Sequence, residues 1–212
     1  MCNRIRDPNQ LEISEIKLNP LQRPRGDWRP GNMVQVVIST SGQRLLEAIR
    51  WGLIPSFSTS EHLDYSTYNA RAERIAEAPT YRGAWRKEQR CLFPMEGFYE
   101  RDKFFRLKDG GLMMAAGLYD DWRSPIGPTI RSGTMITTRP NELVSAVHDR
   151  MPVIVAREDW AKWLGEVPAS EAEIRTLMRP YPAALMATGV ERPRMSPGAI
   201  SVVSAEVQGS LF

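Results

Sequence analysis

The sequence predicts a single α+β domain over residues 1–212, β-rich, with a mostly antiparallel sheet or open barrel and peripheral helices. Short segments rich in β-branched and aromatic residues follow one another closely, without the regular alternation of strand and helix that is typical of parallel sheets. The chain has 212 residues, 42% of them hydrophobic, which suits one sizeable core. It contains no internal repeat and no low-complexity tract, so repeat architectures are excluded.

The clearest predicted strands form a hairpin, in which residues 33–40 (MVQVVIST) and 44–54 (RLLEAIRWGLI) flank a Ser-Gly-Gln turn. Gly110-Gly111 and the region of residues 125–128 supply turns between later strands. These later strands are predicted at residues 90–93, 97–100, 104–107, 113–118, 133–138, 152–155 and 199–203.

Helices are predicted in the remaining segments from start signals and periodicity. Residues 1–33 are polar and rich in proline, which favours loop and extended chain with a short helix near residues 11–16. The segment after Thr138 is expected to form a short helix. Longer helices are predicted at residues 69–77, 80–89, 157–164 and 170–178.

Composition limits the class of protein. The chain has 28 Lys and Arg against 25 Asp and Glu, with a pI near 9.0, so nucleic acid is a permitted partner but not a required one. The two cysteines form neither a disulfide framework nor a metal-binding pattern, and we expect no metal and no cofactor. Charges and prolines replace the apolar run of a signal peptide, so a cytoplasmic protein without a membrane partner is expected. We also expect a monomer.

Cys2 follows Met1, and removal of the methionine would place a primary amine and a thiol on one residue. An α-amine has a pKa of about 7.7–8.0, against about 10.4 for lysine, so it is the better nucleophile at neutral pH. The amine can form a Schiff base with an aldehyde, and the thiol can close a thiazolidine ring. Position alone also allows an incidental cysteine on a frayed terminus.

Two further side chains could handle protons. His148 lies in AVHDRMP between a predicted helix and a strand, where it could be either functional or a capping residue. Glu100 ends the apolar run CLFPMEGFYE, and a buried carboxyl there would suit general acid or base chemistry. Glu96 lies on the same face by strand alternation, so this pattern does not choose between the two.

The other candidates have ordinary structural explanations as well. Asn69 in YNARAE reads as a helix N-cap, with Arg71 and Glu73 on the solvated face of that helix. Trp51 in WGLIP is either a core residue or a platform for an unpaired base. Cationic side chains beside Cys2 and His148 could bind phosphate, and these are Arg4, Arg6 and Arg150.

Six segments together resemble the SRAP (SOS-response-associated peptidase) family of abasic-site processing proteins. They are MCNR, WGLIP, YNARAE, CLFPMEGFYE, TTRPN and VHDRMP, which occur in family order from residue 1 to about residue 155. The resemblance implies the SRAP fold and a substrate of single-stranded DNA that contains an abasic site. It also implies a cytoplasmic protein that associates with the nucleoid on DNA damage, during the SOS response.

The resemblance also assigns roles, and it selects Glu100 over Glu96. It implies a catalytic Cys2 exposed by methionine removal, with Asn69, Glu100 and His148 around it. Our hypothesis is that Glu100 assists opening and dehydration of the deoxyribose, His148 handles protons at the sugar oxygen and Asn69 positions the amine. The product would be a covalent thiazolidine crosslink, reached through lyase-like Schiff-base chemistry. The implied DNA contacts are Arg4, Trp51, Arg71 and Arg150.

Four features depart from the family pattern. Asn3 replaces a usual glycine, Arg101 replaces a common tryptophan, and residues 27–31 (DWRPG) and 199–207 match their motifs only in part. These departures concern DNA affinity and strand preference more than the crosslink. Two other functions stay open, namely a cysteine peptidase or self-processing hydrolase that uses Cys2 and His148, and a non-covalent module for binding single-stranded DNA.

Overall fold

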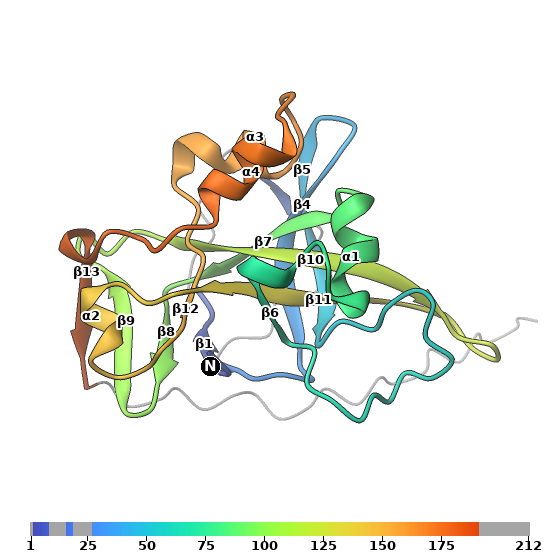
Figure 1. Cartoon of the computed structure of the whole chain (residues 1–212), viewed down its shortest axis with the longest axis horizontal. Coiled ribbons are helices and arrows are strands. Elements are labelled where there is room, and N and C mark those ends of the chain that lie inside the picture. Colours follow the sequence, from blue (N-terminus) through green and yellow to red (C-terminus); the bar gives the residue numbers. More distant parts are fainter. Residues whose placement is uncertain (1, 9–15, 19–26, 191–212) are drawn as a thin grey trace, which may run out of the picture.

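Five strands close a barrel in the computed structural model, which describes residues 2–8, 16–18 and 27–190. Neighbouring strands in the order β11, β10, β7, β4, β5 are antiparallel, and a parallel pairing of β5 with β11 at Ser132↔Arg50 and Gly133↔Trp51 completes the circle (Figure 1). The strands are β4 (Met33–Thr40), β5 (Gln43–Trp51), β7 (Arg90–Met95), β10 (Met113–Arg123) and β11 (Thr129–Thr138). The β-rich α+β fold predicted from the sequence is confirmed.

A second antiparallel sheet lies beside the barrel and contains the N-terminal strand. Its order is β13 (Met186–Gly189), β9 (Lys103–Leu107), β8 (Gly97–Glu100), β1 (Ile5–Arg6) and β3 (Asp27–Trp28). Three short strands extend the barrel sheet, with β2 (Ile16–Leu18) parallel to β5, β6 (Asn69–Arg71) parallel to β11 and β12 (Met151–Pro152) antiparallel to β11. The N-terminal segment is therefore held inside a sheet.

The helices are short and peripheral (Figure 1). Ser170 begins α4 with a reciprocal capping box to Glu173, and Asn141 caps α2 through Val144 N–H. No helix in the described part of the chain is long and apolar enough to cross a membrane. The helices are α1 (Pro79–Arg86), α2 (Glu142–Ser145), α3 (Trp160–Trp163) and α4 (Glu171–Leu177), with 3₁₀ turns η1 (Ala72–Arg74), η2 (Arg157–Asp159) and η3 (Ala183–Leu185).

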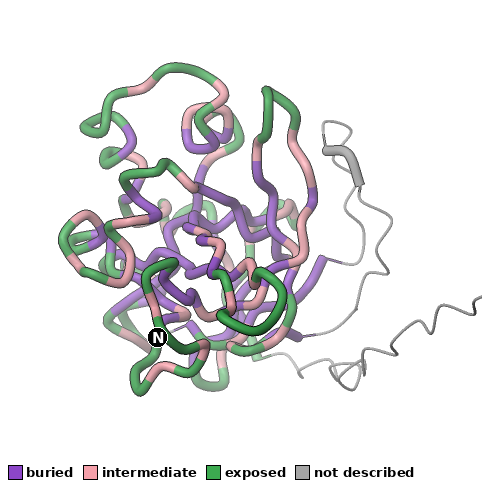
Figure 2. Tube along the Cα trace, turned by 90° about the vertical axis from the view of Figure 1, so that its right-hand side faces the viewer, coloured by how far each residue is buried: buried purple, intermediate pink, exposed green. Residues whose placement is uncertain are grey.

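Residues 91–95 of β7 and 113–118 of β10 are apolar on both faces because these segments separate two hydrophobic clusters. Successive side chains of a strand point to opposite faces. Phe93 joins the cluster that the barrel shares with the second sheet, whereas Leu92 joins the cluster covered by α1, α3 and α4. The buried residues occupy the interior and the exposed ones the outer loops (Figure 2).

Most elements lie where the sequence predicts them, including the hairpin of β4 and β5 and the strand at residues 97–100. The helix expected at residues 69–77 is wrong, because Asn69–Arg71 pairs with β11 as β6 and only the single 3₁₀ turn η1 follows before α1. The expected helix at residues 11–16 lies outside the described residues apart from Ile16 in β2, and the strand expected at residues 199–203 lies wholly outside them.

The packing of the barrel interior around Gly117 predicts that a larger residue at this position lowers the stability of the fold. A Cβ on this residue of β10 would collide with the Phe93 ring and the Thr134 carbonyl oxygen. Gly117→Ala is expected to lower the free energy of unfolding by about 1–3 kcal/mol, the usual cost of overpacking a core. The control is Gly83→Ala in α1, where nothing lies within 4 Å and the gain should be about 0.5–1 kcal/mol. Chemical denaturation of both variants measures the difference, and equal stabilities would contradict this packing.

Candidate active site

The pairing of β1 with β8 brings Cys2 to Glu100. Ile5 lies opposite Phe98, and Tyr99 N–H donates to the Arg4 carbonyl at 2.9 Å. Because the two strands are antiparallel, the chain before β1 runs toward the end of β8, where Glu100 lies. Cys2 is 1% exposed and Glu100 is 7% exposed, so both side chains meet in a desolvated space.

Asn69 holds the main chain of Cys2 from the opposite side. Its Nδ2 donates to the Cys2 carbonyl at 2.7 Å, and the pairing of β6 with β11 fixes its backbone. Its buried Oδ1 has no hydrogen-bond partner among the described residues. The Tyr81 hydroxyl, from α1, donates to the Asn69 carbonyl at 3.1 Å. Asn69 is thus a strand residue directed at Cys2 and not the N-cap that the sequence suggested.

The surroundings of the Cys2 thiol keep it protonated. Burial raises its pKa well above the ordinary value, and the charge of Glu100 raises it further. The thiol donates a long hydrogen bond to the Arg4 carbonyl oxygen, with the sulfur at 3.9 Å. A thiol in this environment is a poor nucleophile until another step creates a strong electrophile beside it.

His148 faces Glu100 across a short gap, with Nε2 at 3.7 Å from Glu100 Oε1. Its Nδ1 accepts a hydrogen bond from the Arg150 backbone N–H at 3.0 Å. An imidazole nitrogen that accepts carries no proton, so the neutral ring bears its proton on Nε2, toward Glu100. Asp149 Oδ1 lies 2.9 Å from the same Nδ1 and would favour the opposite protonation of that atom.

The Arg150 side chain was expected to be available to donate hydrogen bonds to a phosphate, but in the structure it is already bound to other groups. Its side chain is 10% exposed, and the guanidinium donates to both carboxylate oxygens of Glu73 at 2.8 Å and to the Thr137 carbonyl at 2.6 Å. Hydrogen bonds from Arg150 lower the pKa of Glu73. Glu73, expected on a solvated helix face, is therefore a partner of Arg150, and a phosphate would have to displace it.

Trp51 is not an accessible base platform in this structure. Trp51 is 0% exposed because β5 directs its side chain into the barrel interior, where the indole packs against Tyr68 and Phe93. Its Nε1 donates to the Tyr68 carbonyl at 2.9 Å. The sequence offered both core and stacking explanations for Trp51, and the burial supports the core explanation.

The other two arginines expected to contact DNA differ in how accessible their side chains are to a phosphate. Arg71 is exposed at the end of β6. Arg4 lies 3.1 Å from Asp27 and stacks over the Tyr99 ring, with 21% of its side chain exposed. Asp27 is 1% exposed and also lies 3.5 Å from Arg6. Sequence reasoning missed Asp27, although it begins the DWRPG segment that departs from the family pattern.

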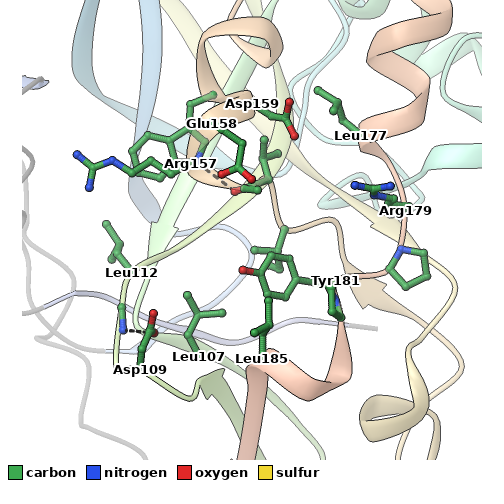
Figure 3. Close-up of a pocket in the computed structure, with 17 residues that line it drawn as sticks. Leu107, Asp109, Leu112, Arg157, Glu158, Asp159, Leu177, Arg179, Tyr181 and Leu185 are labelled. Atoms are coloured by element: carbon green, nitrogen blue, oxygen red, sulfur yellow. Dashed lines mark hydrogen bonds between the residues drawn. The ribbon is translucent and has the colours of Figure 1, made fainter.

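Two cavities border different parts of the molecule. One of about 680 Å³ is lined by residues of η2, α3 and the chain around Tyr181, and contains none of the candidate site residues (Figure 3). Another of about 470 Å³ borders His148 and Arg101, so it adjoins the site. In the described part of the chain, no group of three His, Cys, Asp or Glu residues could hold a metal ion.

Comparison with known proteins places these residues in a family. Residues 1–193 match the family model described as SOS response associated peptidase (SRAP). The chain belongs to the SRAP family. The expected family membership is therefore confirmed.

Several relatives of this SRAP chain carry functional names. Bacillus subtilis abasic site processing protein YoqW is 35% identical over 183 residues, which cover 82% of this chain and 81% of the relative. Abasic site processing protein HMCES of Xenopus tropicalis is 32% identical over 164 residues, but these cover 62% of this chain and 49% of the relative. A crystal structure of a Bordetella bronchiseptica protein superposes with a TM-score of 0.80 at 27% identity, covering 90% of this chain and 100% of that one.

Proposed function

We propose that this SRAP protein processes abasic sites in single-stranded DNA by forming a thiazolidine crosslink through Cys2 after Met1 is removed. The arrangement of Asn69 around Cys2 carries the proposal. Asn69 Nδ2 binds the Cys2 carbonyl, and its buried Oδ1 is left to accept a hydrogen bond. A free Cys2 amine is the donor that would suit this acceptor. The names of the relatives support the choice of substrate.

The first chemical step uses the amine and not the sulfur. The neutral Cys2 amine attacks the aldehyde of the ring-opened deoxyribose, and the carbinolamine then loses water to give an iminium ion. Glu100 donates the proton that the departing oxygen requires. The His148 Nε2–H, with Nε2 at 3.7 Å from Glu100 Oε1, is directed at the carboxylate that remains and stabilises its charge.

The second step uses the thiol. The sulfur attacks the iminium carbon, the C–S bond forms, the iminium becomes a ring amine and the thiol proton passes to the Glu100 carboxylate. A protonated thiol suits this order, because it does not compete with the amine for the aldehyde. The resulting five-membered ring accounts for a durable product.

The raised pKa of the Cys2 thiol argues against the peptidase alternative. A cysteine peptidase needs a thiolate, which forms where nearby positive charge lowers the pKa of the thiol. The carboxylate of Glu100 has the opposite effect here. DNA binding would depend on exposed cations such as Arg71, with Arg4 partly available, and would weaken with salt.

A variant that blocks the amine tests the proposal. Inserting one glutamate between Met1 and Cys2 keeps the thiol but places another residue on its nitrogen. Wild-type protein, with intact mass confirming methionine removal, should give a slow-migrating covalent species with single-stranded abasic DNA on a denaturing gel. The insertion variant should give none. A covalent species of equal yield from both proteins would show that the amine is not the nucleophile and favour a sulfur-based reaction.

A further inference from the structure

We propose that Glu73 is a positioning residue that sets the tautomer of His148 by clamping Arg150. The geometry places four groups in sequence, with Glu73 on Arg150, the Arg150 backbone N–H on His148 Nδ1, and His148 Nε2 beside Glu100. The effect of Glu73 on the crosslinking rate rests on the proposed function. The effect of Glu73 on the tautomer of His148 does not depend on that function.

The first step is the clamp on the Arg150 side chain. Glu73, in η1, receives two parallel hydrogen bonds at 2.8 Å each, and the Thr137 carbonyl of β11 receives a third at 2.6 Å. A bidentate arginine–carboxylate pair is more directional than a single ion pair. Because Arg150 is 8% exposed, its guanidinium has little freedom to move away, and its backbone is held with it.

The second step is a competition for His148 Nδ1. The Arg150 N–H approaches this nitrogen at 3.0 Å and requires it to be an acceptor. The Asp149 carboxylate approaches it at 2.9 Å and would be satisfied only if it carried a proton. Asp149 is on an exposed loop, with 80% of its side chain accessible, so water weakens its influence. The clamp on Arg150 decides the competition in favour of an unprotonated Nδ1.

The third step connects the tautomer to Glu100. With Nδ1 unprotonated, the single ring proton is on Nε2, at 3.7 Å from Glu100 Oε1, where it can be donated. If the Arg150 backbone moves, Asp149 captures a proton on Nδ1, and Nε2 then presents a lone pair toward a carboxylate. In that arrangement neutral His148 donates no hydrogen bond to Glu100, so it neither orients the carboxyl group nor stabilises the carboxylate that forms when Glu100 gives up its proton.

Nitrogen NMR of the histidine rings tests the tautomer directly. The chain has two histidines, and His62, whose side chain is 84% exposed, serves as an internal reference for an exposed ring outside the site. In wild-type protein at a pH where the ring is neutral, His148 should show the limiting shifts of the Nε2–H form. In Glu73→Ala, its shifts should move toward the Nδ1–H form, while those of His62 stay unchanged.

Two further variants separate positioning from general stability. Arg150→Lys keeps the positive charge and the backbone N–H but cannot bind Glu73 in the bidentate manner, so it should change the tautomer as Glu73→Ala does. Glu171→Ala removes a comparable ion pair to Arg175 on α4, away from the site, and should leave His148 unchanged. If Glu73→Ala does not fold, Glu73→Gln, which keeps one acceptor oxygen, gives the same comparison.

The outcomes distinguish this inference from the proposed function. The crosslinking rate of Glu73→Ala should fall by about 10–100-fold, a part of the roughly 10²–10⁴-fold that a positioned acid or base supplies. A wild-type His148 tautomer that persists in both Glu73→Ala and Arg150→Lys would overturn the inference, whatever the crosslinking result. A tautomer change in Glu73→Ala, together with the absence of any crosslink from wild-type protein, would support the clamp and refute the proposed function.

Discussion

Replacing Cys2 with serine is expected to abolish the durable crosslink while leaving the first covalent step intact. Serine keeps the α-amine, so the Schiff base with the aldehyde still forms. Its hydroxyl can close only an oxazolidine, which reopens readily. Cys2→Ser should therefore give no species on a denaturing gel unless borohydride is added to reduce the Schiff base, and Cys2→Ala should behave in the same way.

Cys91 is the matched control for this prediction. It is the second cysteine, it is 0% exposed, and burial raises its thiol pKa as burial raises that of Cys2. Cys91→Ala should therefore crosslink at the wild-type level without borohydride. A durable product from Cys2→Ser without reduction would show that sulfur is not needed. Failure of borohydride to trap the serine variant would show that the amine does not reach the aldehyde.

Replacing Glu100 with glutamine is expected to slow crosslinking by about 10²–10⁴-fold, the range for losing a positioned proton donor. The amide occupies the same place at the end of β8 but cannot donate a proton to the leaving oxygen or accept one from the thiol. Single-turnover rates on a synthetic single-stranded abasic oligonucleotide measure the effect. The Cys2 amine stays in place, so slow product with wild-type structure is the expected pattern.

Glu96→Gln is the control, because Glu96 lies four residues earlier and strand alternation alone does not distinguish it from Glu100. In the structure it lies between β7 and β8, where its backbone N–H donates to the Arg6 carbonyl at 2.9 Å. Its substitution should leave the rate unchanged. Equal rates for Glu100→Gln and wild type would remove Glu100 from the mechanism. A comparable loss in Glu96→Gln would show that the effect is not specific to Glu100. Thermal unfolding of both variants excludes misfolding as the cause.

The strands of the barrel were predictable because their pattern is local. β4 and β5 combine β-branched residues with a turn, and β7 is a continuous apolar run that reflects burial on both faces. The strands β1 and β3 escaped prediction because each has only two residues. Their pairing partners are distant in sequence, and so few residues carry no periodic signal of their own.

The residues of the candidate site could be predicted from the sequence, but the contacts between them could not. Motif resemblance selected Cys2, Asn69, Glu100 and His148, and the structure connects Asn69 to Cys2 and His148 to Glu100. The position of Asn69 on β6 was missed because its helix-like pattern is overridden by pairing with β11. Local propensity is a weak prior where a buried backbone can complete a sheet.

The sequence by itself determined the fold class, the family and the residues that carry the proposed chemistry. Strand patterns and motifs can be recognised from the types of residues and their order along the chain alone. Only the tertiary structure decided that Trp51 is enclosed in the barrel and that Glu73 holds Arg150. Burial and pairing depend on which distant segments meet when the barrel closes. The same closure places the His148 ring between a backbone donor and Glu100.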